Sequence, residues 1–399
     1  MATKKKAKRG KNKAKGGLFN KSSEETINPT KKFIKDISDD ENDIELTEQG
    51  KSHFQTLKKQ KYIDSMEPPV LLNQMFHEFD VIKLNKSSFL ELEAKDIIIE
   101  DVKYCFKDGD NTWVFLDDKA IMLDFGLMPE LTIEYENSDI LKYSPKLFND
   151  KLYFVDDKNI FIYSLLEEKW ETFSISGEIT SSVLFDGDKF FLIVDFIKLI
   201  SLNESFKESW SFFTEGYLLN TPIIKDDFIF LTSSDGMLYK LDNTGDIVWS
   251  FNSKSAIENS PMSFEDIIII NNMAGKLIFL SEDDKSELAN LDLGFHLMRE
   301  PFIKEDTLYI FNRRFLYKIN LKDLKIVDIV QLETPIESIS NLDNDNIYIT
   351  LSDGTGIVVD SNFTNISFTD TKSIKKVIQH INYLILIDSE FKLVKVELV

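Results

Sequence analysis

The sequence predicts an all-β protein in which most of the chain forms one ring of repeated four-stranded sheets. Three observations support this prediction: a phrase that returns at a regular interval, short apolar runs between polar turns, and tryptophans with the same period. The chain contains 32 Phe but only 15 Gly and 9 Pro. Because aromatic and β-branched side chains favour strands, most of the apolar content is expected in sheets.

The repeated phrase consists of Ser, Thr or Glu before Pro, then a polar turn and an apolar strand. Its prolines are Pro145, Pro222, Pro261 and Pro301, which follow one another at intervals of 77, 39 and 40. The interval of 77 is nearly two periods, and Ser182-Val183 occupies the missing start. Weaker copies begin near Tyr104, Ser338 and Lys375, which makes eight starts.

Four short strands in about 40 residues form one blade of a β-propeller. A single blade cannot bury both of its faces, so successive blades must stack around a ring. The sequence therefore predicts an eight-bladed β-propeller over residues 85–399, with seven blades as the alternative. The last copy ends after its third strand, at Leu393-Val394-Lys395-Val396. We expect Phe89-Leu90-Glu91-Leu92 to supply the missing fourth strand and so to remove the exposed edges.

Residues 1–84 differ in composition from the repeats. Residues 1–50 lack periodicity and carry a basic block followed by an acidic one, so we predict a disordered arm. Residues 51–84 are predicted to be a short helical segment, because Leu72, Met75, Phe76 and Phe79 recur at helical spacing. This helix either covers part of the propeller or docks a partner.

The basic block suggests an anionic partner. Residues 1–16 carry a charge of +8 and the whole chain −21, which leaves −29 for the remainder. The basic residues are Lys4, Lys5, Lys6, Lys8, Arg9, Lys11, Lys13 and Lys15. Without aromatic residues among them, they suit phosphate contacts rather than base reading. RNA, the ribosome or an anionic membrane surface would fit this arm, and a merely solubilising role is the alternative.

One copy of the repeat points to a known family. The run Ser234-Asp235-Gly236-Met237-Leu238-Tyr239-Lys240-Leu241-Asp242-Asn243-Thr244-Gly245-Asp246-Ile247-Val248-Trp249 resembles the repeat of PQQ-like propellers. That family contains quinoprotein dehydrogenases and the outer-membrane assembly lipoprotein BamB. Trp170, Trp210 and Trp249, at intervals of 40 and 39, resemble the tryptophans that lock neighbouring blades in this family.

The resemblance does not extend to the features of the quinoprotein enzymes. Those enzymes carry a vicinal disulfide over the cofactor and a metal held by carboxylates, whereas this chain has the single cysteine Cys105. The histidines are isolated in sequence, and the acidic pairs Asp156-Asp157, Asp226-Asp227 and Asp283-Asp284 fall at expected turns. We therefore expect no catalytic residue, no cofactor and no metal site.

The sequence favours a non-enzymatic scaffold, a monomeric propeller that binds protein partners in a larger assembly. An RNA- or ribosome-associated factor and a quinoprotein-type propeller enzyme are the alternatives. The single cysteine and the polar stretch after the basic start predict a cytoplasmic protein. No apolar run is long enough to span a membrane.

Overall fold

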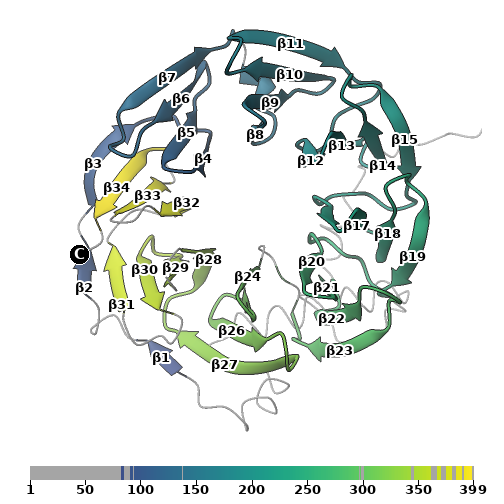
Figure 1. Cartoon of the computed structure of the whole chain (residues 1–399). Helices are drawn as coiled ribbons and strands as arrows, with labels where there is room; N and C mark the ends of the chain where they lie inside the picture. Colours follow the sequence, from purple (N-terminus) through teal and green to yellow (C-terminus); the bar gives the residue numbers. More distant parts are fainter. Residues whose placement is uncertain are drawn as a thin grey trace, which may run out of the picture. The chain divides into compact units, whose positions relative to one another are not determined.

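The computed structural model describes residues 82–84, 90–92, 94–136, 138–295, 297, 301–342, 346–360, 366–369, 374–379, 383–388 and 391–397. All of them belong to the second of the two units into which the chain divides, Met1–Lys51 and Ser52–Val399. The described strands form eight sheets, arranged as a ring (Figure 1). The protein is an eight-bladed β-propeller of four-stranded antiparallel blades, as the repeats predict.

The first four blades follow one another without irregularity, each running from the ring centre outward. Blade 1 contains β4 (Tyr104–Asp108), β5 (Asn111–Phe115), β6 (Lys119–Leu123) and β7 (Pro129–Glu134). After the short 3₁₀-helix η3 (Ser138–Ile140), blade 2 contains β8 (Lys146–Phe148), β9 (Lys151–Val155), β10 (Asn159–Ser164) and β11 (Lys169–Ser174). Blade 3 contains β12 (Leu184–Asp186), β13 (Lys189–Val194), β14 (Lys198–Leu202) and β15 (Glu208–Phe213). Blade 4 contains β16 (Ile223–Lys225), β17 (Phe228–Thr232), β18 (Met237–Leu241) and β19 (Ile247–Asn252).

The remaining four blades complete the ring. Blade 5 contains β20 (Met262–Phe264), β21 (Ile267–Asn271), β22 (Lys276–Ser281) and β23 (Glu287–Asp292). Blade 6 contains β24 (Phe302–Lys304), β25 (Thr307–Phe311), β26 (Phe315–Asn320) and β27 (Lys325–Leu332). Blade 7 contains β28 (Ile336–Asn341), β29 (Asn346–Leu351), β30 (Gly356–Asp360) and β31 (Ile366–Thr369). Blade 8 contains β32 (Ile374–Gln379), β33 (Tyr383–Asp388) and β34 (Leu393–Glu397). The eight predicted starts all fall at or within two residues of a first strand.

Three strands that precede blade 1 add to the outer edges of the last three blades. β1 (Ile82–Leu84) pairs in parallel with β27, and β2 (Leu90–Leu92) pairs in parallel with β31. β3 (Ala94–Ile99) pairs antiparallel with β34 and supplies the fourth strand of blade 8. The prediction that the front of the domain closes the ring is confirmed, but its assignment to Leu90–Leu92 is wrong. Blade 7 already has four strands, so β2 becomes its fifth, and the next segment closes the ring.

The core consists of apolar layers between neighbouring blades. All five residues from Phe190 to Val194 on β13 are buried. Phe190, Leu192 and Val194 pack with Tyr153 of blade 2 and its neighbours. Phe191 and Ile193 face the other way, toward Ile229 of blade 4. A strand covered on both faces needs apolar residues at every position, which explains runs such as Phe190–Val194.

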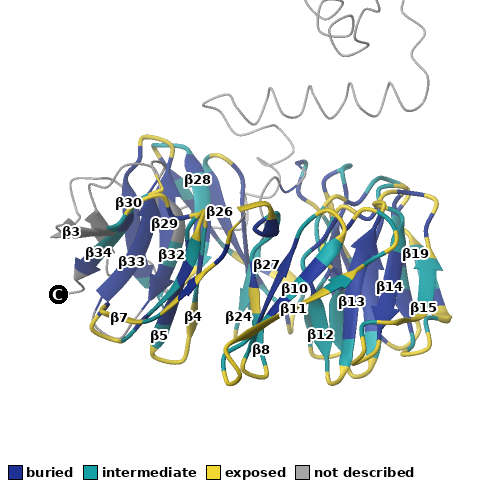
Figure 2. Cartoon of the chain, turned by 90° about the horizontal axis from the view of Figure 1, so that it is seen from above, coloured by how far each residue is buried: buried dark blue, intermediate teal, exposed yellow. Residues whose placement is uncertain are grey.

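Each blade places its turns at two ends. The turns between the first and second and between the third and fourth strands lie at one end. The turn between the second and third strands and the connection to the next blade lie at the other, which we call the connection face. Figure 2 shows the exposed residues gathered in the loops at both ends, with buried strands between them.

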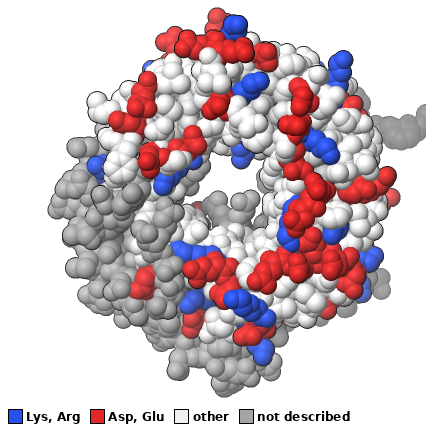
Figure 3. All heavy atoms as spheres, in the orientation of Figure 1, with Lys and Arg blue, Asp and Glu red and all other residues white. Residues whose placement is uncertain are grey.

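Acidic side chains are abundant on the surface. The pairs Asp156-Asp157, Asp226-Asp227 and Asp283-Asp284 lie in turns between strands, as predicted. In the view of Figure 3, acidic side chains form a band over the blades that Figure 1 labels β12 to β23. Among the described residues, the structure has no helix long and apolar enough to cross a bilayer.

The predictions for residues 1–81 concern a part of the chain that lies outside the described residues. They comprise the arm of residues 1–50, its eight basic residues, and all but the last three residues of the helical segment predicted for 51–84. Those three residues, Ile82–Leu84, are strand β1.

Candidate protein-interaction surface

The predicted blade-locking tryptophans occupy equivalent outer strands but make different contacts. Trp249 is 7% exposed, and its Nε1 donates to the Glu282 carbonyl oxygen of blade 5 at 3.0 Å. Trp210 Nε1 donates likewise to the Asn243 carbonyl oxygen of blade 4 at 3.0 Å. Trp170 is 38% exposed, and its ring packs on Phe154 and Tyr163 of its own blade. Trp210 and Trp249 thus bond to the following blade, whereas the aromatic contacts of Trp170 lie within blade 2.

A buried charge cluster joins blades 4 and 5 near Trp249. Lys240 is 4% exposed, and its Nζ lies 3.5 Å from Glu282 Oε1 and 4.0 Å from the centroid of the Phe228 ring. Lys225 also pairs with Glu282. Sequence reasoning missed this cluster, because Glu282 stands beside Asp283-Asp284 in an ordinary acidic turn and its two lysines lie 42 and 57 residues away.

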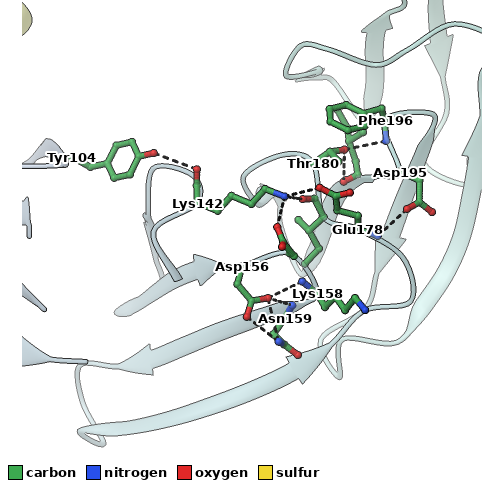
Figure 4. A network of polar contacts seen from close by, with 12 residues as sticks. Tyr104, Lys142, Asp156, Lys158, Asn159, Glu178, Thr180, Asp195 and Phe196 are labelled. Carbon is green, nitrogen blue, oxygen red and sulfur yellow. Dashed lines mark hydrogen bonds and ion pairs between the residues drawn. The ribbon is translucent and has the colours of Figure 1, made fainter. Parts of the chain in front are cut away.

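On the connection face, Lys142 ties blade 2 to its neighbours (Figure 4). Its Nζ donates to Asp157 Oδ1 at 2.6 Å, to Glu178 Oε1 at 3.0 Å and to the Ile179 carbonyl oxygen at 3.0 Å. Burial lowers the pKa of Lys142, but the hydrogen bonds to Asp157 and Glu178 outweigh that effect and raise it. Lys142 is therefore a charged structural tie.

A depression of about 550 Å³ lies next to this tie. Its lining comes from η3, the residues just after it and the β9–β10 turn, and comprises Ser138, Asp139, Leu141, Lys142, Asp156, Asp157, Lys158 and Asn159. Asp156 Oδ1 accepts from the backbone nitrogens of Lys158 and Asn159 at 2.7 and 2.6 Å. These carboxylates have turn-forming and ion-pairing roles. Among the described residues, no three His, Cys, Asp or Glu side chains are placed to hold a metal ion.

The network leads to an exposed apolar surface between blades 3 and 4. Glu178 N donates to Asp195 Oδ1 at 2.8 Å, and Phe196 N donates to Thr180 Oγ1 at 3.2 Å (Figure 4). Phe196 lies in the β13–β14 turn, 40% exposed. Its ring centroid is 6.5 Å from that of Tyr217, which lies in the connection between β15 and β16.

Buried and exposed residues alternate along the first part of the β15–β16 connection. Thr214, Gly216 and Leu218 are buried, whereas Glu215, Tyr217 and Leu219 are exposed. Tyr217 is 59% and Leu219 51% exposed. We call Phe196, Tyr217 and Leu219 the aromatic ridge.

Both neighbouring turns hold the connection in place. Leu218 N donates to the Phe196 carbonyl oxygen at 2.5 Å. On the other side, Tyr217 N donates to Ser234 Oγ at 2.8 Å, and Ser234 N donates to the Tyr217 carbonyl oxygen at 2.9 Å. A Cβ atom at Gly216 would lie 2.5 Å from Asp235 N, so this approach of the connection to the β17–β18 turn requires glycine. The ridge is therefore built on ordered backbone.

The backbone at Phe196 is strained. Asp195 and Phe196 have φ of 54° and 60°, and Ile197 N donates to the Val194 carbonyl oxygen across the turn. Asn-Gly is the preferred pair for such turns, and a bulky residue there costs about 1–3 kcal/mol. Phe206 also has a positive φ, but its ring stacks on that of Phe173, with 4.3 Å between the ring centroids, and packs against the core. Phe196 has no such core position to offset the cost.

The ridge has an acidic rim. Asp195, Glu215 and Asp235 are exposed. Asp195 and Glu215 lie on the two segments that carry the ridge, and Asp235 lies on the neighbouring β17–β18 turn. Residues 195–197, 214–220 and 233–236 contain no Lys, Arg or His. The nearest lysine in sequence, Lys198, pairs with Glu208 at 3.0 Å. The surface therefore combines apolar contact area with negative charge, and sequence reasoning did not find it.

Comparison with known proteins agrees with the repeat pattern. Residues 166–362, just under half of the chain, match the family described as outer membrane protein assembly factor BamB. This match supports a PQQ-like β-propeller. A search of curated protein sequences gave no match.

Solved structures share the propeller fold at low sequence identity. BamB from Moraxella catarrhalis is 12% identical with a TM-score of 0.58, and the match covers 74% of this chain and 96% of that one. The computationally designed Ika8 protein is 11% identical with a TM-score of 0.61, over 78% and 100% of the two chains. The C-terminal WD40 domain of Sif2 is 12% identical with a TM-score of 0.60, over 78% and 99%. At such identities the likeness establishes the fold alone, because propellers host many unrelated functions.

Proposed function

We propose that this PQQ-like propeller is a non-enzymatic scaffold that holds protein partners together in a larger assembly. The observation that carries the proposal is the aromatic ridge: three large apolar side chains, each at least 40% exposed, on an ordered part of the connection face. Exposed apolar side chains that are grouped and rimmed by polar residues mark interaction sites more often than single ones do. The family match adds support, since BamB is by its description an assembly factor.

The test compares two tagged full-length variants in quantitative affinity purification. The double substitution Tyr217→Ser and Leu219→Ser removes most of the ridge, and we expect the co-purifying proteins to fall at least tenfold. The matched control is Leu166→Ser with Leu288→Ser, since these leucines are 81% and 48% exposed and lie away from the ridge. An unchanged set of partners in both variants would contradict the proposal.

A second role is proposed for the basic arm, on the strength of its eight positive charges within residues 1–16. In this role the arm binds an anionic partner such as RNA, a ribosome or an anionic membrane surface. The acidic body repels phosphates, so binding must depend on the arm and fall steeply with salt. We expect full-length protein to bind RNA or anionic vesicles at low salt and a chain starting at residue 51 not to bind. Equal binding by both chains would contradict this role.

A further inference from the structure

We propose that the aromatic ridge recognises a positively charged peptide segment with large apolar side chains, contributed by a partner protein. This inference rests on the proposed scaffold function and specifies the chemistry of what the connection face binds. It follows from three features of the surface: its apolar row, its acidic rim and the conformation of Phe196.

The apolar row sets the shape of the ligand. Tyr217 and Leu219 are exposed on either side of the buried Leu218 in the β15–β16 connection, and the Phe196 ring lies beside that of Tyr217 with a centroid separation of 6.5 Å. A row of this kind offers contact area to two or three side chains of a segment that lies along the connection. Because the connection already bonds to Phe196 and Ser234 on its two sides, the row is ordered before the ligand arrives. Such preorganisation reduces the entropic cost of binding.

The acidic rim sets the charge of the ligand. Asp195 and Asp235 flank the connection on its two sides, and Glu215 precedes the ridge on the connection itself. No basic side chain belongs to these three segments, so their field favours cations and repels carboxylates. Lysine and arginine side chains are also attracted to the faces of aromatic rings, such as those of Tyr217 and Phe196, by cation–π interactions. A segment with basic residues between its apolar ones satisfies both parts of the surface.

The conformation of Phe196 supports a binding role over a structural one. Its φ of 60° is a conformation that glycine adopts freely and phenylalanine adopts at a cost. Glycine would avoid this cost at the position. Contact between the exposed Phe196 ring and a ligand gives the phenylalanine a reason to occupy the turn.

The experiment uses three fluorescent 12-residue peptides that share their leucines and phenylalanines. They differ only in the intervening residues, which are Lys in one, Ser in the second and Glu in the third. Binding to the full chain is measured by fluorescence anisotropy at about 0.15 M salt. We expect the Lys peptide to bind at least tenfold more tightly than the Ser peptide. The basic arm attracts the Glu peptide, so its affinity for the full chain does not by itself report on the ridge. For this peptide we compare the affinity of the wild type with that of the ridge variants, and we expect the two to be equal.

Variants locate the site. Phe196→Gly and Tyr217→Ser are each expected to weaken the Lys peptide at least tenfold. Asp195→Asn combined with Glu215→Gln is expected to weaken it about fivefold while leaving the Ser peptide unaffected. Leu166→Ser is the matched control and should leave the affinity unchanged. Phe196→Gly should not lower the thermal midpoint, which separates a binding role from a structural one.

Four results would overturn the inference: no measurable binding of the Lys peptide, equal affinity for the Lys and Ser peptides, equal loss in Leu166→Ser, or a thermal midpoint that falls in Phe196→Gly. If partners are lost from the Tyr217→Ser, Leu219→Ser variant but the Lys peptide does not bind, the scaffold function stands and this ligand chemistry is wrong. If the Lys peptide binds at the ridge but partner recovery is unchanged, the scaffold function is what fails.

Discussion

Single side chains that cross from one blade to the next explain how particular residues stabilise the ring. Trp249 combines a ring buried against Phe230 with an indole N–H bonded to Glu282 of the next blade. Trp170 stands at the equivalent place in blade 2, but more than a third of its surface is exposed. The same residue type at the same repeat position therefore contributes unequally.

We expect Trp249→Ala to lower the free energy of unfolding by about 3–5 kcal/mol, the usual cost of truncating a buried aromatic residue. Trp170→Ala is expected to lower the free energy of unfolding by about 1–2 kcal/mol less than Trp249→Ala does, because the more exposed Trp170 ring buries less apolar area on folding. Urea denaturation of both variants measures the difference. Equal losses would show that exposure does not govern the contribution of these tryptophans.

Glu282 is the second residue on which blades 4 and 5 depend. Glu282→Ala leaves the buried Lys240 without the carboxylate that now lies 3.5 Å from its Nζ. Removing one partner of a buried pair typically costs about 3–5 kcal/mol, since the other charge stays buried. Asp283→Ala in the same turn is the control, with an expected change below about 0.5 kcal/mol for a surface position. A comparable effect of both substitutions on urea unfolding would contradict the prediction.

At the scale of elements, strands β1, β2 and β3 bind the outer edges of blades 6, 7 and 8 in turn. Their contributions differ, because β1 and β2 are fifth strands whereas β3 completes a blade that otherwise has three. Without β3, the backbone of β34 would present an unpaired edge, a known template for aggregation.

Truncation separates these roles. A chain starting at Ala94 retains β3, and we expect it to stay folded and free of aggregates with a modestly lower thermal midpoint. A chain starting at Asp101 lacks β3 and is expected to unfold or aggregate. Removal of residues 1–50 should leave the midpoint unchanged. Thermal unfolding measures the stability of each truncated chain, and size-exclusion chromatography detects aggregation. Identical behaviour of the chains that start at Ala94 and at Asp101 would rule out β3 as the closing strand.

For the whole molecule, burial of tyrosines in the layers between blades makes stability depend on alkaline pH. Burial, with a smaller effect of the Glu171 charge, raises the pKa of Tyr153 to about 12. Burial also raises the pKa of Tyr317. A folded-state pKa above the unfolded value of about 10 means that the folded protein holds the phenol proton more tightly. This contribution is fully present below pH 10 and is lost as the pH rises toward 12.

We expect the free energy of unfolding to fall as the pH rises from 10 to 12 and to fall less steeply in Tyr153→Phe. A shift of about two pH units corresponds to a difference of about 2–3 kcal/mol at the alkaline end. Urea denaturation at pH 8, 10, 11 and 12 gives the two curves. Parallel curves for the wild type and the variant would contradict the assignment to Tyr153.

The sequence by itself predicted a propeller of eight blades, with seven as the alternative, and located the start of each repeat. A second strand such as Phe190–Val194 is covered on both faces, so it must be apolar throughout, and Asp, Asn and Gly must mark the turns. These requirements repeat in every blade and involve only neighbouring residues, so they are visible as a period. The front of the domain was also identifiable as the source of closure, because blade 8 ends one strand short.

Only the tertiary structure decided which front strand closes the ring and what the surface presents. Leu90–Leu92 and Ala94–Ile99 are both short runs with apolar residues, and the choice between them depends on which blade edge each one reaches. Lys240 and Glu282 meet across 42 residues because blades 4 and 5 stack. In the sequence, Phe196 cannot be distinguished from the apolar residues of the strands around it. In the structure it is exposed, because a turn holds it at positive φ beside Tyr217. Pairings and exposure of this kind arise only when the ring closes, because they depend on distances between residues that no local pattern encodes.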